Sequence, residues 1–240
     1  MAIGDFYLVF DGEDDYIEIP DSADFSVATT GKLSVAAWMR PDVLTFPVSQ
    51  STGYVHWLGK GEVGQHEWVF RMYNENTTDT PPRPNRISFY VFNPTGGEGI
   101  GSYFQEPVQA GEWIHVVGIA DGTTTSIYKN GEFKRCDRYT GTGPPPCHNY
   151  APERWITPTR GTAPLRIGTR DRGSFFLGAI REVRLWSRAL TASEVGVLYG
   201  DAVPQDGLVA EYLLRQDMAV DGTGLHHGLI SGASWVPSSG

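Results

Sequence analysis

The feature that most constrains the fold is a period-two alternation of apolar and polar residues, which recurs along nearly the whole chain. Segments with this alternation are separated by turn dipeptides such as DG, NG, GG and PP. Successive side chains of a strand point to opposite faces of a sheet, so the pattern predicts many short strands. The segments are YLVF, YIEI, LSVAAWM, EWVFRMY, RISFYVF, WIHVVGIA, TSIYKNG, PLRIG, AIREVRLW, LVAEYLL and GLISGASWV. The sequence therefore predicts an all-β fold, built as a two-sheet antiparallel β-sandwich.

One short helix is predicted near residues 191–199. Thr191 is an N-cap residue with Glu194 three positions later, which is the pattern of a capping box. Gly200 follows the last turn, where glycine commonly ends a helix. We expect this helix to close one end of the sandwich.

The length and charge of the chain limit its organisation and its partners. No linker divides the 240 residues, so we expect a single domain over 1–240. The net charge of -9 leaves no basic stripe to neutralise phosphates, which argues against nucleic acid as a partner. No apolar run is long enough to span a bilayer, and no signal peptide is visible at the N-terminus.

Cys136 and Cys147 are the only cysteines, and they flank a proline-rich loop. They lie within an irregular segment, 136–164, which we interpret as an insertion because structureless loops of this length are uncommon in a compact domain. A disulfide here would close a short loop and stabilise it by about 2–3 kcal/mol. The alternative is two unrelated thiols. We predict the disulfide, and with it an oxidising, extracellular setting for a secreted protein.

Three blocks of sequence resemble a known family. They are LVFDGEDDYIEIPDSADFSV followed by LSVAAWMRPD, then GEWIHVVGIADGTTTSIYKNGE, then LRIGTRDRGSFFLGAIREVRLWSRALTASEV. In this order they resemble a LamG-like jelly-roll domain of the concanavalin A-like lectin/glucanase superfamily, which is akin to the pentraxins. The resemblance implies a jelly-roll fold. It is also compatible with a larger secreted protein, whose other domains would then be partners of this one. Residues 206–236 resemble the segment that usually precedes the first hairpin, so we expect them to pair beside residues 7–10.

The stretch VFDGEDDYIEIPDS has three interpretations: a catalytic strand, a calcium-binding loop or an acidic turn without an ion. Glu13, Asp15 and Glu18 form the string E-x-D-x-x-E of retaining glucanases, which need two carboxylates about 5 Å apart on one surface. Strand alternation puts Glu18 on the opposite face from the other two acids, so we favour an acidic turn. The resemblance implies a structural calcium ion, held by Asp11 and by Glu182 from the strand AIREVRLW. A solvated acidic turn without an ion is the alternative.

Flat aromatic side chains and planar polar groups suit sugar recognition. We predict that Trp57, Arg71, Trp155, Arg170 and Asp171 lie at one rim of the sandwich and hold a neutral or acidic glycan. The leading hypothesis is a non-catalytic carbohydrate-binding, lectin-like domain for an extracellular glycan or polysaccharide. The first alternative is a polysaccharide-degrading enzyme, either a glycosidase or a lyase, and the second is an adhesion or protein-interaction module. Binding is favoured because the sequence offers no convincing acid–base pair.

Overall fold

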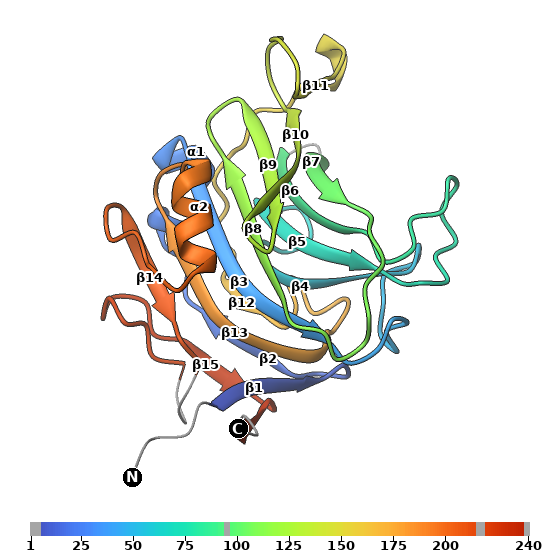
Figure 1. Ribbon diagram of the computed structural model, residues 1–240, viewed down its shortest axis with the longest axis vertical. Helices are drawn as coiled ribbons and strands as arrows, with labels where there is room; N and C mark the ends of the chain where they lie inside the picture. The colour runs from blue at the N-terminus through green and yellow to red at the C-terminus, as the bar shows by residue number, and fades with distance from the viewer. Residues whose placement is uncertain (1–5, 94–96, 215–218, 238–240) are drawn as a thin grey trace.

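The computed structural model describes residues 6–93, 97–214 and 219–237, which form two β-sheets packed face to face (Figure 1). Neighbouring strands are antiparallel except where β10 pairs with β11. The predicted all-β, two-sheet jelly-roll sandwich is confirmed. No described helix is long or apolar enough to cross a membrane.

The larger sheet has nine strands and carries both the first and the last strand of the described chain. Its order along the path is β11 (His148–Asn149), β10 (Glu132–Arg138), β9 (Thr124–Lys129), β8 (Ile114–Ala120), β3 (Leu33–Pro41), β13 (Leu177–Trp186), β1 (Phe6–Asp11) and β16 (Ser234–Pro237), with β14 (Leu208–Tyr212) paired to β13.

The second sheet has seven strands. Its order is β15 (Leu229–Ser231), β2 (Tyr16–Ile19), β12 (Leu165–Ile167), β4 (Tyr54–Lys60), β5 (Trp68–Tyr73), β6 (Ile87–Asn93) and β7 (Glu98–Phe104). The strand pattern did not predict β4, β7 or β10. Strand β7 contains glycines at alternating positions, β10 is mostly polar, and β4 has no regular alternation of apolar and polar residues.

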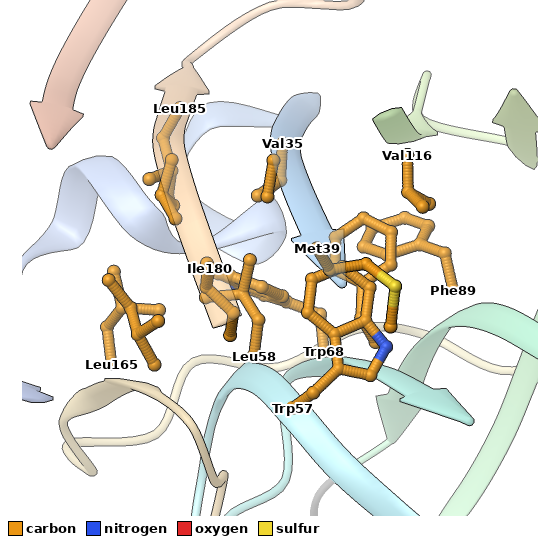
Figure 2. Close-up of a cluster of buried hydrophobic side chains, with 14 of the residues drawn as sticks. Val35, Met39, Trp57, Leu58, Trp68, Phe89, Val116, Leu165, Ile180 and Leu185 are labelled. Carbon is orange, nitrogen blue, oxygen red and sulfur yellow. The ribbon is translucent and has the colours of Figure 1, made fainter. Parts of the chain in front are cut away.

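The core lies between the sheets and is built from the inward side chains of both (Figure 2). Strand β5 shows the principle: Trp68, Phe70 and Met72 point into the core, whereas Arg71 and Tyr73, each one position away from these residues, lie on the outer face. Burial of apolar surface contributes about 25 cal/mol per Å². The period-two pattern therefore fixes which side chains remain available on the outer faces.

The C-terminal segment adds a strand to each sheet, and its predicted pairing beside residues 7–10 is confirmed. Strand β16 pairs with β1, and Tyr7 lies opposite Val236 while Val9 lies opposite Ser234. Strand β15 pairs with β2 in the other sheet. Residues 206–236 resemble a segment that usually precedes the first hairpin in the sequence. In this protein they come last but still lie beside that hairpin.

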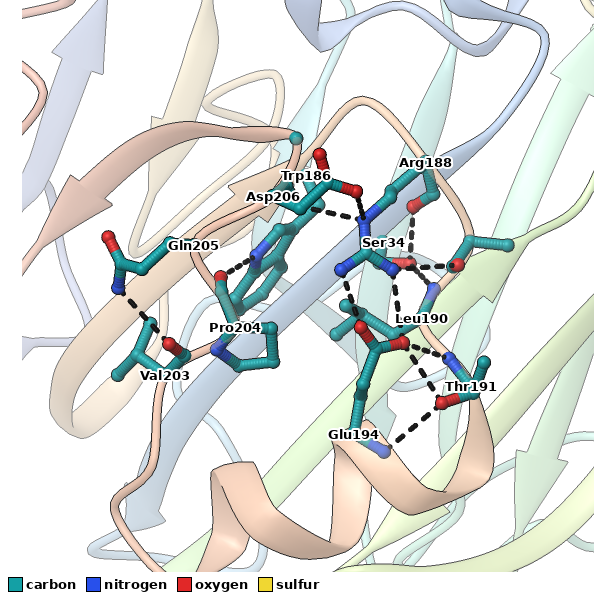
Figure 3. Close-up of polar contacts among 12 residues, drawn as sticks. Ser34, Trp186, Arg188, Leu190, Thr191, Glu194, Val203, Pro204, Gln205 and Asp206 are labelled. Carbon is teal, nitrogen blue, oxygen red and sulfur yellow. Dashed lines mark hydrogen bonds and ion pairs between the residues drawn. The ribbon is translucent and has the colours of Figure 1, made fainter.

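The predicted helix is α2 (Ala192–Tyr199), which packs on the outer face of the nine-stranded sheet (Figures 1 and 3). Its capping box is present: Thr191 Oγ1 accepts a hydrogen bond from the amide of Glu194 at 3.2 Å, and Glu194 Oε2 accepts from the amide of Thr191 at 2.8 Å. Arg188 donates to the same carboxylate (Figure 3). Three shorter helical segments are η1 (Ala23–Phe25), α1 (Val27–Thr30) and η2 (Pro152–Arg154).

The insertion is held to the sandwich at two places. Cys136 of β10 forms a disulfide with Cys147, 11 residues later, which confirms the predicted bond. Near its other end, the amide of Gly161 donates to Glu67 Oε1 at 3.1 Å. The insertion is therefore an ordered border of the sandwich.

Candidate functional site

The outer face of the seven-stranded sheet carries the main candidate site. A cross-strand row runs from His56 on β4 through Arg71 on β5 and Ser88 on β6 to Tyr103 on β7. These side chains share one face because they occupy the positions between inward-pointing residues. The face is therefore polar and aromatic, in contrast to the apolar core beneath it.

Arg71 lies at the centre of this face, surrounded by three tyrosines. Its guanidinium carbon is 4.0 Å from the ring centroid of Tyr90, 5.0 Å from that of Tyr54 and 5.3 Å from that of Tyr73. Its Nε donates to Ser88 Oγ at 3.3 Å. We call these five residues the Arg71 cluster. Cation–π attraction and the hydrogen bond fix the orientation of the guanidinium.

Glycines of β7 give Tyr90 its position. A Cβ atom built on Gly101 would lie 2.4 Å from Cδ2 of the Tyr90 ring, which is closer than real contacts allow. The ring therefore lies directly over the glycine backbone of the neighbouring strand, a common reason for glycine inside a strand. Tyr90 remains partly exposed, so its ring is available at the surface.

The loop that follows β12 adds a buried polar group beside the Arg71 cluster. Arg170 donates to Asp171 Oδ2 at 2.7 Å. His56 Nδ1 lies 3.5 Å from Asp171 Oδ1, and His66 Nε2 lies 3.7 Å from Oδ2. Burial of Asp171 on its own would raise its pKa, but His56 and Arg170 hold that pKa well below the usual range.

The two histidines of this group are neutral at physiological pH. Burial lowers the pKa of His56 to about 3, with help from the positive charges of Arg170 and Arg71. Burial and Arg170 lower the pKa of His66 to about 4. The charge of Asp171 is thus balanced by Arg170, and the imidazoles add none.

The structure brings together three of the five predicted ligand-binding residues: Arg71, Arg170 and Asp171. Trp57 is a correction. It is 0% exposed and packs in the core, with its ring centroid 4.8 Å from that of Phe70. Trp57 follows Val55 at strand spacing and so points inward, and it cannot present a ring face at the rim.

Trp155 lies on the insertion and remains 36% exposed. Its indole Nε1 donates to the backbone oxygen of Tyr150 at 3.0 Å. Burial, the charge of Asp137 and the nearby Tyr90 raise the pKa of Tyr150 to about 12. The insertion therefore borders the Tyr90 side of the face. Tyr90 itself was missed in the sequence, although its alternation with Phe89 and Val91 was visible there.

The acidic turn lies elsewhere, between β1 and β2. Carboxylate oxygens of Asp11, Asp14 and Asp15 lie within 4.8 Å of one another. Burial raises the pKa of Asp15, and the charges of Asp11 and Asp14 raise it further. Clustered carboxylate oxygens suit calcium, which also relieves repulsion among them. The donor set therefore fits a calcium ion, with Asp14 and Asp15 as partners of Asp11.

Glu182 does not belong to this group, which corrects the predicted pair. Asp11 lies opposite Leu177 on β13, and Glu182 is five residues farther along that strand. At about 3.3 Å per residue, the two are too far apart to share an ion. Glu182 instead accepts a hydrogen bond from Arg184 at 3.3 Å.

The acids of the string E-x-D-x-x-E are separated by the turn. Glu13 is exposed within the turn, whereas Asp15 Oδ2 accepts from the amide of Asp11 at 2.9 Å. Glu18 lies on the outer face of β2 and accepts from Arg166 Nε at 2.7 Å. Each acid thus has a different environment.

Comparisons with known proteins agree with this architecture. The Bacteroides ovatus structure titled a "putative carbohydrate binding protein" has 18% identity and a TM-score of 0.66, over 99% of this chain and 61% of that chain. The native heptameric SAP-like pentraxin from Limulus polyphemus has 12% identity and a TM-score of 0.60, over 99% and 97%. The receptor binding domain of the botulinum neurotoxin C/D mosaic serotype has 13% identity and a TM-score of 0.51, over 82% and 46%.

At these identities the structural matches show the fold alone. The chain spans about three fifths of the length of the Bacteroides ovatus protein. No curated protein has a matching sequence. Residues 11–196 match the model of a family described as the concanavalin A-like lectin/glucanases superfamily. Because that match covers most of the chain, the protein belongs to the concanavalin A-like lectin/glucanase superfamily.

Proposed function

We propose that the protein is a carbohydrate-binding domain that holds a glycan on the outer face of the seven-stranded sheet. The observation that carries this proposal is the Arg71 cluster, in which Tyr54 and Tyr90 remain partly exposed around an oriented guanidinium. Tyrosine rings offer flat apolar faces to the C–H surfaces of sugars and hydroxyl groups to their oxygens. The guanidinium adds planar hydrogen-bond donors. The description of the Bacteroides ovatus protein supports the same function.

The position of the cluster also favours recognition. Three adjacent strands, β4, β5 and β6, hold its side chains, and sites on strands are more rigid than sites on loops. The insertion borders one side through Tyr150, and the loop with Arg170 and Asp171 borders another. A glycan on this face would therefore meet a preorganised surface with two walls.

Three further parts of the proposal concern the setting and the chemistry. We propose a secreted protein, because the disulfide suits an oxidising compartment. We propose a structural calcium ion at Asp11, Asp14 and Asp15. We also propose binding without catalysis, because the turn separates the acids considered for glycoside hydrolysis: Glu13 is exposed, and Glu18 is bound to Arg166 on the outer face of β2.

A glycan array followed by calorimetry on the best ligand tests the proposal. Tyr90→Ala should weaken binding about 10-fold to 100-fold, as losing one stacking aromatic does in other polymer-binding sites. Tyr199→Ala is the matched control, because Tyr199 is 41% exposed on α2, which covers the other sheet. Equal binding by both variants and the wild type would exclude this face.

The same ligand also tests for catalysis. Incubation with the wild type should leave the glycan chain length unchanged and release no reducing ends. If the glycan is degraded, and Tyr90→Ala slows the degradation, the face is an active site. The enzyme hypothesis then replaces the binding module.

A further inference from the structure

Arg71 combines two features on its face: it has no acidic partner among the described residues, and its terminal nitrogens make no described hydrogen bond. Within residues 6–93, 97–214 and 219–237, its hydrogen bond goes to Ser88 Oγ, a neutral acceptor, and its other contacts are tyrosine rings. Only Nε donates in that bond. The terminal guanidinium nitrogens, with four of the five N–H groups, remain for a ligand.

The neighbouring arginines are already engaged. Arg83 pairs with Asp79 at 3.2 Å and donates to the hydroxyl of Tyr73. Arg170 is bound to Asp171. Arg166 and Arg135 are also paired with carboxylates, and Arg86 donates both Nε and one terminal nitrogen to Gln105 Oε1. Arg71 therefore combines a full charge with free donors.

A positive potential at this point is unusual in a chain of net charge -9. Its effect is visible at His56, whose pKa is lowered by burial and by the charges of Arg170 and Arg71. The guanidinium is only partly exposed between the three tyrosine rings, and reduced contact with water strengthens its interaction with an anion. A planar guanidinium matches a carboxylate or a sulfate group through two parallel hydrogen bonds.

We propose that Arg71 is the specificity-determining residue of this face and that it selects a glycan bearing carboxylate or sulfate groups. The inference rests on the proposed carbohydrate-binding function and narrows it to one substrate class. Tyr54 and Tyr90 would contact the sugar ring, and the anionic group would lie against the terminal nitrogens of Arg71. A neutral sugar would leave those donors without their strongest acceptor.

The test compares polygalacturonate with its carboxyl-reduced form, and a sulfated glycosaminoglycan with its desulfated form. The wild type should bind at least one anionic polymer about 10-fold or more tightly than the matched neutralised polymer, since one charge-assisted bond lost is worth about a factor of ten. The pair that shows the difference identifies carboxylate or sulfate as the recognised group. The comparison needs no variant, so it does not depend on how substitutions fold.

Variants then assign the effect to the residue. Arg71→Gln should lose about 10-fold in affinity for the anionic polymer and bind both forms alike. Arg83→Gln is the matched control and should retain the preference, because Arg83 stacks on Tyr73 as well but is paired with Asp79. Loss of the preference in Arg83→Gln but not in Arg71→Gln would overturn the assignment.

The outcomes separate this inference from the proposed function. If the wild type binds an anionic polymer and its neutralised form equally, the face binds glycans without selecting charge, and only the inference fails. If it binds no polymer of either kind and no glycan on the array, the proposed function fails as well.

Discussion

The carboxylate of Glu67 forms an ion pair with the ammonium group of Lys60 in the interior of the protein, where the two residues are 4% and 0% exposed. Glu67 also accepts hydrogen bonds from Ser26 and from the amide of Gly161. Lys60 has a second partner, Asp21, at 2.8 Å. This pair therefore joins the β4–β5 hairpin to the end of the insertion and to the segment before α1.

Removing Glu67 should strongly destabilise the fold. Glu67→Ala leaves the charge of Lys60 buried with Asp21 as its remaining carboxylate partner, and it removes the acceptor of the Gly161 amide. We expect the free energy of unfolding in urea to fall by about 3–5 kcal/mol, the usual cost of breaking a buried pair. Glu62→Ala is the control, because Glu62 is 41% exposed in its pair with Arg166 and should cost no more than about 1 kcal/mol. Equal losses in both variants would contradict the prediction.

The capping box at α2 should make stability depend on pH at acidic values. The hydrogen bond from Arg188, followed by that from the Thr191 amide, lowers the pKa of Glu194 to about 2, from an ordinary value of 4.5. A carboxyl group whose pKa is lower in the folded state stabilises above its ordinary pKa and loses that effect as pH falls. The wild type should therefore exceed Glu194→Gln in stability by about 1 kcal/mol near neutral pH, because the site is close to solvent.

This difference should shrink between about pH 5 and about pH 2 in urea unfolding experiments. Arg188→Gln provides an independent check, because it removes the largest cause of the shift and should flatten the same part of the profile. A difference between the wild type and Glu194→Gln that stays constant over this range would refute the linkage.

Reduction of the disulfide should destabilise the protein moderately. Cys136 and Cys147 close a loop with a sequence separation of 11, for which loop-closure entropy amounts to about 3 kcal/mol. The Cys136→Ser/Cys147→Ser variant should unfold at correspondingly lower urea concentration than the oxidised wild type. Thiol titration of the unfolded, unreduced wild type should find no free thiol. Two reactive thiols in protein from an oxidising compartment would argue against the bond.

Calcium should raise the melting temperature if the acidic turn binds it. A ligand that binds only the folded state stabilises it by mass action, so the shift should grow with calcium concentration. Asp14→Asn should remove the shift, because Asp14 is one of the three clustered carboxylates. Glu13→Gln, an exposed acid outside the cluster, should retain it. If the wild type has the same melting temperature with calcium and with EDTA, the turn does not bind calcium.

Trp57 and Trp155 should behave oppositely. Trp57→Ala empties a core position and should cost about 3–5 kcal/mol of stability, with the remaining folded protein binding normally. Trp155→Ala truncates a side chain that is 36% exposed and should cost far less. Calorimetric melting of both variants checks this directly. A stable Trp57→Ala variant with impaired glycan binding would restore the original prediction for this residue.

Local pattern was enough to predict most of the fold. Alternation located most strands, and Thr191 with Glu194 located α2, because both signals arise from neighbouring residues. The same alternation could have placed Trp57, since Val55 two positions earlier is buried as well. The prediction for Trp57 was wrong because it rested on the suitability of an indole ring for sugar binding and ignored the inward-facing position of Trp57 on its strand.

The local sequence pattern could not predict strand register or the contacts between residues that are distant in the sequence. Whether Glu182 meets Asp11 depends on the register between β1 and β13, which sets Asp11 opposite Leu177. A break in the register of β13 against β3 between Arg181 and Arg184 changes the spacing again, and Glu182 there has a φ of 56°. Asp171 likewise pairs with Arg170, and Arg71 has no carboxylate partner among the described residues, which only the assembled face shows.

The pairing of β16 with β1 and of β15 with β2 also bears on the order of events during synthesis. Among the described strands, β1 and β2 are synthesised first, and each pairs along one edge with a strand from residues 229–237. Until those residues are made, β1 and β2 expose free hydrogen-bonding edges, which can pair with other chains. Closure of both sheets therefore requires residues 229–237, and a nascent chain halted before residue 229 would present two open edges to chaperones.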